Sequence, residues 1–140
     1  MENEVLKAIR NRRSTRKYKA EQISEEELQT ILEAAIDAPS ANNSQSWHFT
    51  VIQDKDLINN MSDKSKKIML QSDNENIIKM GKSDLNIFYK APTVIVVSGK
   101  EDVDSSLVDC SAAIENMLIA CESINLGAVW IGLIRFFFLY

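Results

Sequence analysis

The sequence has few of the residues that build metal sites and disulfide frameworks. It contains one histidine and two cysteines, Cys110 and Cys121, and no CxxC pair. A single histidine cannot complete the His/Cys ligand set of a zinc site. The cysteines are eleven residues apart in one apolar segment, and in a helix they would be separated by roughly 16 Å, too far for a disulfide. We therefore expect no metal site and two buried thiols in a reducing compartment.

The sequence also lacks the segments that direct a chain to a membrane or to nucleic acid. Residues 1–14 contain no apolar h-region, so no signal peptide is expected. No uninterrupted apolar run approaches the ~20 residues that a membrane span needs. The formal net charge is −4, which argues against a general nucleic-acid binder. We expect a cytoplasmic, soluble protein with no membrane partner and no nucleic-acid partner.

The length and composition indicate one globular domain. The chain has 140 residues, of which 45% are hydrophobic and 26% charged. These values suffice for one hydrophobic core and not for two. Because the sequence shows neither a linker nor an internal repeat, a single domain over residues 1–140 is expected.

Hydrophobic spacing predicts helices over residues 3–11, 24–36, 55–71 and 106–124. Ser24 and Glu27 form a capping-box pattern at the start of the second of these helices. The segment 106–124 is apolar around most of its circumference, which is typical of a helix buried centrally or in an interface. Gly127 is expected to end it in the left-handed conformation.

Strands are predicted where β-branched and aromatic residues cluster, over residues 47–53, 93–99 and 128–132. Residues 72–86 are polar and poorly patterned, so they are expected to form a flexible loop or lid. The final residues, LIRFFFLY, end the chain on an apolar run that would promote aggregation if it were exposed. We interpret this end as truncated, shifted in frame or buried by a partner chain.

The first segment with chemical potential is Arg12-Arg13-Ser14-Thr15-Arg16. In an extended chain the side chains alternate, so Arg12, Ser14 and Arg16 would share one face. Two guanidiniums and a hydroxyl on one side suit a phosphate group, which accepts charge-assisted hydrogen bonds. A solvated basic patch after a helix is the alternative interpretation.

Two further segments could approach a ligand. Residues 39–45, PSANNSQ, combine small and amide side chains, and amides can both donate to and accept from a heteroaromatic ring. Residues 127–132, GAVWIG, would end a strand with a glycine that permits close backbone approach. The alternatives are an ordinary helix-to-strand loop for the first segment and a helix cap followed by a core strand for the second.

Taken together and in this order, RRSTRKY, APSANNSQSWHF and NLGAVWIG resemble the nitroreductase family, and the resemblance spans Ile9 to Gly132. The apolar helix and the APTVIVV strand fit the same pattern. The resemblance implies an α+β fold with a mixed sheet flanked by helices. It also implies that the long apolar helix over residues 106–124 lies at the interface of a homodimer.

The resemblance further implies an FMN-dependent oxidoreductase. Members hold FMN at the dimer interface, where both chains line the site. NAD(P)H reduces the flavin by hydride transfer, and an oxidised small molecule such as a nitroaromatic or quinone then reacts in the same cleft, which gives ping-pong turnover. The flavin carries the chemistry, so no catalytic side chain is expected. The alternatives are a non-catalytic flavin-binding protein and an interaction-only dimer.

The resemblance also assigns roles to individual residues. Arg12, Ser14 and Arg16 would hold the FMN phosphate and ribityl chain, with the backbone of Arg13 nearby. Pro39, Ser40 and Asn42 would come from the partner subunit and face the ring. The remaining candidates are Gln45 at the same ring edge and the backbone of Ile131 and Gly132, close to the reactive ring nitrogen.

Three positions qualify this assignment. Members commonly have proline before the tryptophan, whereas this chain has Ser46, which is expected to be a minor change. The family continues past Gly132 with a further strand, a basic residue that helps to hold the phosphate, and a tail that wraps the other subunit. Here only Arg135 and FFFLY follow that region, so this strand and tail are expected to be missing. Asp109 is expected to be a capping or interface residue rather than an acid catalyst.

Overall fold

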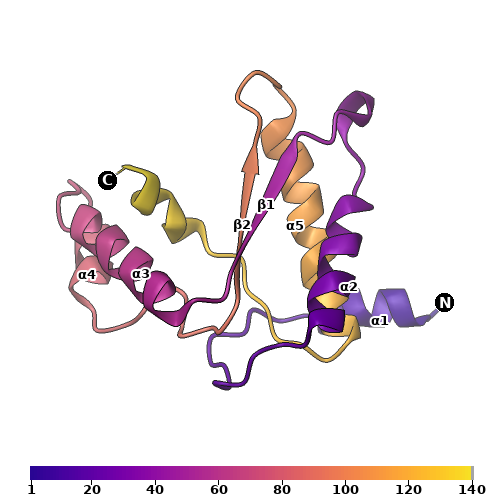
Figure 1. Ribbon diagram of the computed structural model, residues 1–140, viewed down its shortest axis with the longest axis horizontal. Helices are drawn as coiled ribbons and strands as arrows, with labels where there is room; N and C mark the ends of the chain where they lie inside the picture. The colour runs from indigo at the N-terminus through magenta and orange to yellow at the C-terminus, as the bar shows by residue number, and fades with distance from the viewer. Residues whose placement is uncertain (140) are drawn as a thin grey trace. The chain divides into compact units, whose positions relative to one another are not determined.

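The computed structural model describes residues 1–139, and Tyr140 lies outside the described residues. These residues form two compact units, one of residues 1–15, 22–51 and 95–130 and the other of residues 16–21, 52–94 and 131 onward. The elements in chain order are α1 (Glu4–Asn11), α2 (Glu25–Ile36), η1 (Ala41–Asn43), β1 (Trp47–Ile52), α3 (Lys55–Met69), α4 (Glu75–Lys82), β2 (Val94–Gly99), α5 (Ser106–Ser123) and η2 (Gly132–Leu139) (Figure 1). Each unit is described by itself below.

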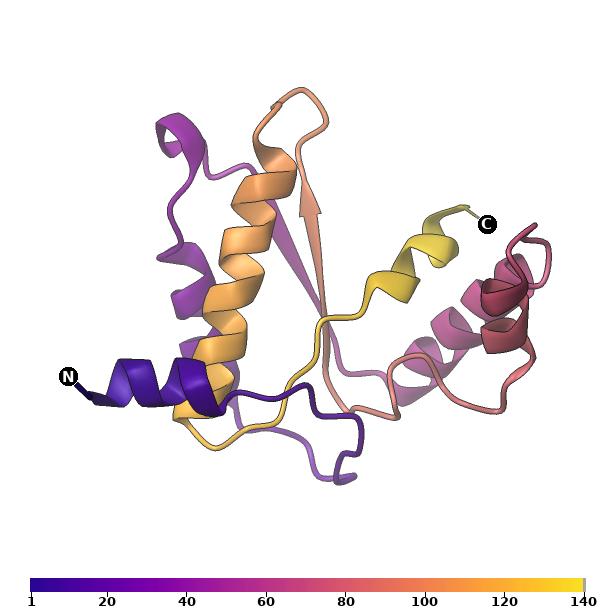
Figure 2. The same cartoon turned by 180° about the vertical axis from the view of Figure 1, so that it is seen from behind.

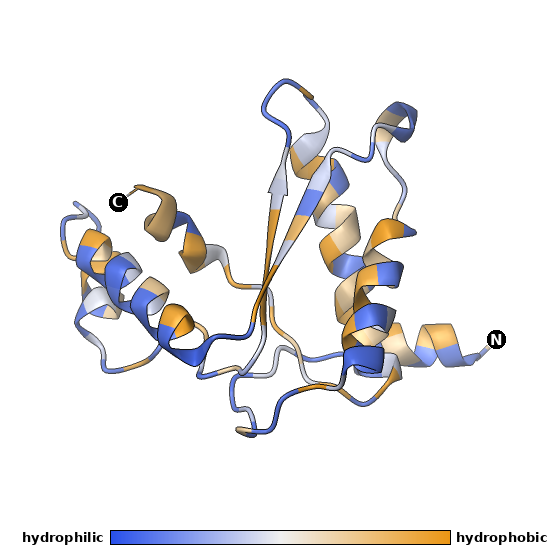
Figure 3. Ribbon diagram, viewed as in Figure 1, coloured by the Kyte–Doolittle hydropathy of each residue, from blue (hydrophilic) through white to orange (hydrophobic). Residues whose placement is uncertain are grey.

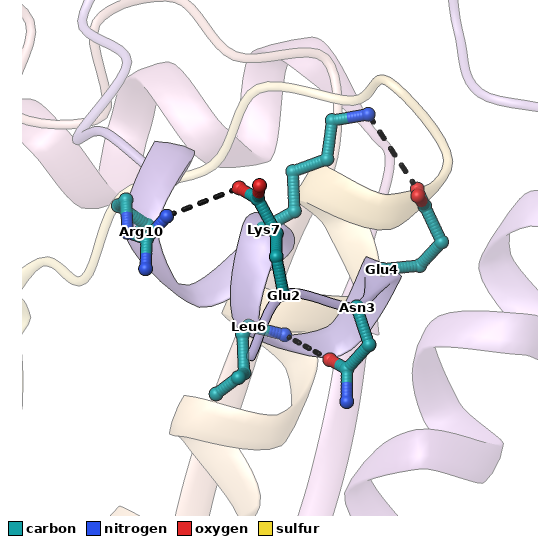
Figure 4. A network of polar contacts seen from close by, with 6 residues as sticks. All are labelled: Glu2, Asn3, Glu4, Leu6, Lys7 and Arg10. Carbon is teal, nitrogen blue, oxygen red and sulfur yellow. Dashed lines mark hydrogen bonds and ion pairs between the residues drawn. The ribbon is translucent and has the colours of Figure 1, made fainter.

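Local hydrogen bonds start the first two helices where the sequence pattern predicts them. Asn3 caps α1, because its Oδ1 accepts the Leu6 N–H at 2.9 Å (Figure 4). The capping box of α2 is confirmed: the Ser24 N–H donates to Glu27 Oε2 at 2.7 Å, and the Glu27 N–H donates to Ser24 Oγ at 3.1 Å. These bonds satisfy N–H groups that have no partner within the helix.

Two exposed ion pairs lie around α1. Lys7 Nζ is 3.7 Å from Glu4 Oε2, and Arg10 Nη1 is 3.1 Å from Glu2 Oε1 (Figure 4). Water screens such surface pairs, so each stabilises the helix by about 1 kcal/mol at most.

The core of the first unit lies between α2 and α5, which run side by side in both views (Figures 1 and 2). Ala35 on α2 and Ala113 on α5 are fully buried, and their small side chains let the helices approach closely. Asn116 Nδ2 on α5 also donates to the Ala34 carbonyl oxygen at 2.9 Å. The other buried members of this cluster are Ile31, Ala38, Met117 and Cys121. Both cysteines are buried free thiols, as predicted.

In the described part of the chain, β1 and β2 form a two-stranded sheet. The pairing is antiparallel (Figure 1), and beyond the strand ends the Lys100 N–H donates to the Ser46 carbonyl oxygen at 3.0 Å. Trp47 and Phe49 on β1 pack against the α2–α5 core with their rings stacked at 6.2 Å. The predictions of strands at 47–53 and 93–99 are confirmed. The predicted strand at 128–132 is wrong, since Ala128 there makes one isolated bridge and η2 already begins at Gly132.

The end of α5 corrects the predicted role of Gly127. Asn125 takes the left-handed conformation, with φ 61°. The Leu126 N–H donates to the Cys121 carbonyl oxygen at 2.8 Å, and the Asn125 N–H donates to that of Glu122 at 3.2 Å. This pair of bonds is a Schellman motif, which requires the left-handed residue directly after the helix cap. Asparagine tolerates that conformation better than most residues with a side chain, so Gly127 is available for another purpose.

α5 is not covered on all sides within the described chain. Leu107 is 79% exposed and Val108 is 70% exposed, both near the start of the helix. The face that carries Ala113, Met117 and Cys121 is buried against α2. The apolar side chains at the start of α5 are therefore exposed within the described chain.

The second unit contains α3, α4 and η2. The expectation of a loop over 72–86 is wrong, because α4 occupies Glu75–Lys82 and Asn74 caps it by accepting the Asn76 N–H at 3.0 Å. A Cβ at Gly81 would lie 3.0 Å from the Lys66 carbonyl oxygen, so the glycine allows α4 to lie against α3. This tertiary contact stabilises a helix that eight residues alone would not sustain.

The last described residues form η2, which packs against α3. Figure 3 shows hydrophobic colour over most of η2. Phe136 is buried, whereas Phe138 and Leu139 are exposed. The apolar run noted in the sequence is thus only partly covered. Among the helices of residues 1–139, none has the length and apolar character needed to cross a membrane.

Candidate functional site

The chain leaves α1 in an extended conformation and pairs with the segment after α5. Arg12 has φ −49° and ψ 130°, and the next bridge joins Ser14 to Ala128 in parallel orientation. The Thr15 N–H donates to the Ala128 carbonyl oxygen at 3.0 Å. Segments that are more than a hundred residues apart in the sequence, RRST and GAVW, therefore lie side by side.

Gly127 makes this pairing possible. A Cβ at position 127 would lie 2.7 Å from Thr15 Oγ1, 2.8 Å from Thr15 Cγ2 and 2.9 Å from Thr15 Cβ. These atoms belong to a short β-branched side chain and cannot swing away as the end of a long one could. The glycine is thus required for close approach between the two segments, and not for a left-handed turn.

Replacing Gly127 with alanine is expected to destabilise the protein by about 1–3 kcal/mol, because the added methyl group overlaps Thr15. The free energy of unfolding in urea, measured without added FMN, would show this. Adding Thr15→Gly to the same chain removes all three overlapping atoms and should recover part of the loss. Gly132→Ala is the matched control, since a Cβ there has no neighbouring atom within 4 Å. Equal stability of the Gly127 and Gly132 variants would contradict the close approach.

The basic residues of the first segment have different surroundings. The Arg13 guanidinium donates to the carbonyl oxygens of Arg10 at 2.7 Å and Arg12 at 2.8 Å, so this side chain closes the end of α1. The role of the Arg13 backbone near a ligand stays a prediction. Arg12 is half-buried, and Ser14 is exposed. Arg16 is exposed and belongs to the second unit, so its convergence with Arg12 and Ser14 stays a prediction.

Ile131 and Gly132 also belong to the second unit. Ile131 is half-buried, and Gly132 is exposed with open space where a side chain would be. Their approach to a ligand held by the first unit stays a prediction.

The second predicted segment forms a tight loop over residues 40–46, here named the 40–46 loop. Asn42, Asn43 and Gln45 have φ values of 53°, 54° and 44°. Residues other than glycine adopt such left-handed conformations at an energetic cost, and they do so where the surroundings enforce them. Pro39, Asn42 and Gln45 are exposed, so their side chains are accessible to a ligand.

Hydrogen bonds within the loop account for part of this enforcement. The Asn43 N–H donates to the Ser40 carbonyl oxygen at 3.1 Å, and the Ser44 N–H donates to that of Ala41 at 3.0 Å. The Ser40 hydroxyl oxygen accepts the Gln45 N–H at 3.0 Å. Ser40 therefore braces the loop from within, in addition to any contact that it makes with a ligand.

Asp109 on α5 supplies the remaining contacts. Its Oδ1 accepts the Ala41 N–H at 3.1 Å, and its Oδ2 accepts the hydroxyls of Ser44, Ser46 and Ser105 at 3.0 Å each. The Asp109 residue is only 3% exposed. The sequence suggested a capping or interface role and missed this one. The available signal was an acidic residue on a helix that is otherwise largely apolar.

Ser46, which stands where members of the family commonly have proline, makes a buried hydrogen bond. It is 1% exposed, and its hydroxyl is one of the donors to Asp109. Proline has no hydroxyl and could not make this contact. The sequence did not predict this hydrogen bond, and the expectation that the change from proline is minor stays a prediction.

The environment of Asp109 affects its pKa in two opposing ways. Burial raises the pKa of the carboxyl group, because it disfavours the charged form. The hydrogen bonds from the Ala41 N–H and from the hydroxyls of Ser105, Ser46 and Ser44 lower it, and together they outweigh burial. The pKa of Asp109 is therefore below its usual value, and the side chain is ionised at neutral pH.

This shift predicts an acid-dependent contribution to stability. A carboxyl group with a lowered pKa stabilises the folded state fully above its unfolded value of 3.8, and the contribution is lost as pH falls through the folded pKa. The Asp109→Asn variant lacks this titration. We expect the wild-type protein to be the more stable at pH 7 and the difference to shrink below pH 3.8. Urea unfolding of both proteins across this range is the measurement, and a constant difference would contradict the assignment.

The structure thus brings together two of the three predicted segments by direct pairing, namely 12–15 and 127–130. It places Ser40, Asn42 and Gln45 in the 40–46 loop, which is anchored to α5, and Pro39 directly before that loop. Within residues 1–139, no group of three or more His, Cys, Asp or Glu residues is arranged to hold a metal ion. The side chains of these segments include guanidinium and hydroxyl groups, which can bind anions, and exposed amides, which can both donate and accept hydrogen bonds.

Comparison with known proteins connects this arrangement to a family. The model of the nitroreductase family matches residues 9–138. A protein of Archaeoglobus fulgidus that carries the provisional name NADH dehydrogenase/NAD(P)H nitroreductase is 38% identical over 130 residues, which cover 92% of this chain and 67% of the relative. The FMN reductase [NAD(P)H] of Bacillus subtilis is 32% identical, with 95% of this chain and 55% of the relative covered. The chain therefore spans between about half and two thirds of these relatives.

A solved structure shows the same fold. The crystal structure of a nitroreductase with bound FMN from Bacteroides fragilis superposes with a TM-score of 0.90 at 34% identity. The match covers 94% of this chain and 71% of that one. The predicted α+β fold, with helices flanking a sheet, is confirmed by this similarity.

Proposed function

The chain belongs to the nitroreductase family, and from this premise we propose that it is an FMN-dependent oxidoreductase. It passes hydride from NAD(P)H through the flavin to a small oxidised acceptor such as a nitroaromatic or a quinone. The observation that carries the proposal is the pairing of Ser14 with Ala128. This pairing joins the arginine-rich segment 12–16, a candidate for phosphate binding, to the segment 127–132 that follows α5.

The residues present fit a flavin mononucleotide. Arg12, Ser14 and Arg16 offer guanidinium and hydroxyl donors for a phosphate. Exposed Asn42 and Gln45 offer amides that can donate to and accept from the edge of the ring. Open space at Gly132 allows the backbone of Ile131 and Gly132 to meet a planar ligand. When bound, the flavin supplies hydride acceptance and donation, and the protein supplies position and electrostatics.

The proposal includes a homodimer. Exposed Leu107 and Val108 give α5 an apolar surface that a second copy would cover. The 40–46 loop of one chain would then face the flavin held by the other. Such a shared site accommodates NAD(P)H and the acceptor in turn, which gives ping-pong turnover.

The visible absorption spectrum of freshly purified protein is the first test. A flavin band, or its appearance after FMN is added and excess is removed, is expected. Oxidation of NADH or NADPH should then be stimulated by a quinone or nitroaromatic acceptor. A protein that stays colourless with added FMN would overturn the proposal. A protein that binds FMN without stimulated turnover would instead be a non-catalytic flavin-binding protein.

A further inference from the structure

We propose that Asp109 is a positioning residue of the flavin site, which holds the 40–46 loop in the conformation that presents Asn42 to the ring. This inference rests on the proposed function, because it assumes that the loop faces FMN. Asp109 itself touches no ligand in this scheme. It acts through the loop, from a fixed point on α5.

The loop needs an external anchor. Asn42, Asn43 and Gln45 have left-handed backbone conformations, which asparagine adopts at a small cost and glutamine at a larger one, so neighbouring contacts are needed to hold all three together. The internal bonds around Ser40 tie the middle of the loop to itself. They do not tie it to the rest of the first unit. The contacts of Asp109 do, since they join α5 to Ala41, Ser44 and Ser46.

Asp109 is suited to this role by its location. It lies in the first turn of α5, where the positive end of the helix dipole favours a carboxylate. It is 3% exposed, and four hydrogen bonds already occupy its two oxygens. A carboxylate only accepts, so all three serine hydroxyls must donate to it and are thereby oriented. Its buried position makes it a support for the loop rather than a group that meets FMN.

A loop held in the binding conformation before the ligand arrives increases affinity, because binding does not have to order it. If only a fraction of molecules has the loop in place, the apparent dissociation constant rises in inverse proportion to that fraction. Removal of the anchor should therefore weaken FMN binding even though no ligand contact is removed.

Two serines offer a matched pair of variants. Ser44 and Ser105 each donate one hydroxyl bond of 3.0 Å to the same oxygen of Asp109. Ser44 belongs to the 40–46 loop, whereas Ser105 directly precedes α5 and its side chain makes no capping hydrogen bond to that helix. Replacing either with alanine removes one bond to the carboxylate, but only Ser44→Ala loosens the loop. The comparison separates positioning of the loop from general weakening around Asp109.

The experiment measures FMN dissociation constants of the full chain by fluorescence quenching, together with hydrogen exchange of the Ala41 and Gln45 amides without FMN. We expect Asp109→Asn to raise the dissociation constant on the order of tenfold or more, and Ser44→Ala about threefold to tenfold. Ser105→Ala should stay within about twofold of the wild type. Exchange of the two amides should accelerate in Asp109→Asn and Ser44→Ala and not in Ser105→Ala. If Asp109→Asn fails to fold, the serine pair still decides the matter.

Each outcome bears on a different claim. Equal FMN affinity in wild type, Asp109→Asn and Ser44→Ala would overturn the positioning role and leave the proposed function intact. Faster amide exchange with unchanged affinity would also overturn it, because the loop would then not serve the flavin. Failure of the wild-type protein to bind FMN would overturn the proposed function and this inference with it.

Discussion

Replacing both Arg12 and Arg16 with alanine is expected to release FMN from a protein that remains folded. Each guanidinium would donate a charge-assisted hydrogen bond to the phosphate, and such bonds contribute about 1.5–3 kcal/mol each. Loss of both corresponds to roughly 3–6 kcal/mol, or on the order of a hundredfold to ten-thousandfold in Kd. Titration of the apoprotein with FMN, followed by fluorescence, gives this ratio directly.

The control for this variant removes the same charge from the same stretch of chain. Arg10→Ala combined with Lys17→Ala also deletes two positive charges and spares Arg12 and Arg16. Arg10 forms an exposed ion pair with Glu2, and its loss should cost little stability. If both double variants weaken FMN equally, general electrostatic attraction explains binding and the specific assignment of the phosphate ligands is wrong. Circular dichroism of both variants checks that the fold is intact.

The Ile31→Ala substitution is expected to have the largest effect on stability. Ile31 is 4% exposed in the cluster between α2 and α5. Truncating it removes buried methyl groups and leaves a cavity, which costs about 2–5 kcal/mol at such sites. Urea unfolding followed by circular dichroism measures the loss, at one protein concentration because dimer formation would contribute to stability.

Ile36→Ala is the matched control on the same helix. The same chemical change is made at a residue that is 49% exposed at the end of α2. We expect a change within about 0.5–1 kcal/mol there, because little buried surface is lost. Both residues lie in the helix that the hydrophobic spacing predicts, and the structure shows that Ile31 is buried and Ile36 is exposed. Comparable losses for the two variants would contradict the burial described for Ile31.

The sequence by itself predicted the elements that depend on neighbouring residues. Three of these signals involve only residues close together in the sequence: the capping box of Ser24 and Glu27, the apolar spacing of α2 and the β-branched run of β2. Both elements formed near their predicted bounds. The order of the three segments also sufficed to predict the family, and the family model confirms it over residues 9–138. The pattern of hydrophobic residues over 72–86 did not predict α4, because this short helix depends on contact with α3.

Only the tertiary structure decided which residues hold the site in place. In the sequence Asp109 is one of three acidic residues on a largely apolar helix, yet its donors Ala41 and Ser46 precede it by 68 and 63 residues. Gly127 reads as a helix cap, yet its function is to admit Thr15, which lies at the other end of the chain. Contacts between residues far apart in the sequence do not produce a periodic pattern, because the periods of 3.6 and 2 residues reflect only the geometry of a single helix or strand. Folding brings the Thr15 nitrogen to 3.0 Å from the Ala128 carbonyl oxygen and the Ala41 nitrogen to 3.1 Å from Asp109 Oδ1, and the anchoring residue is identified by the second of these contacts.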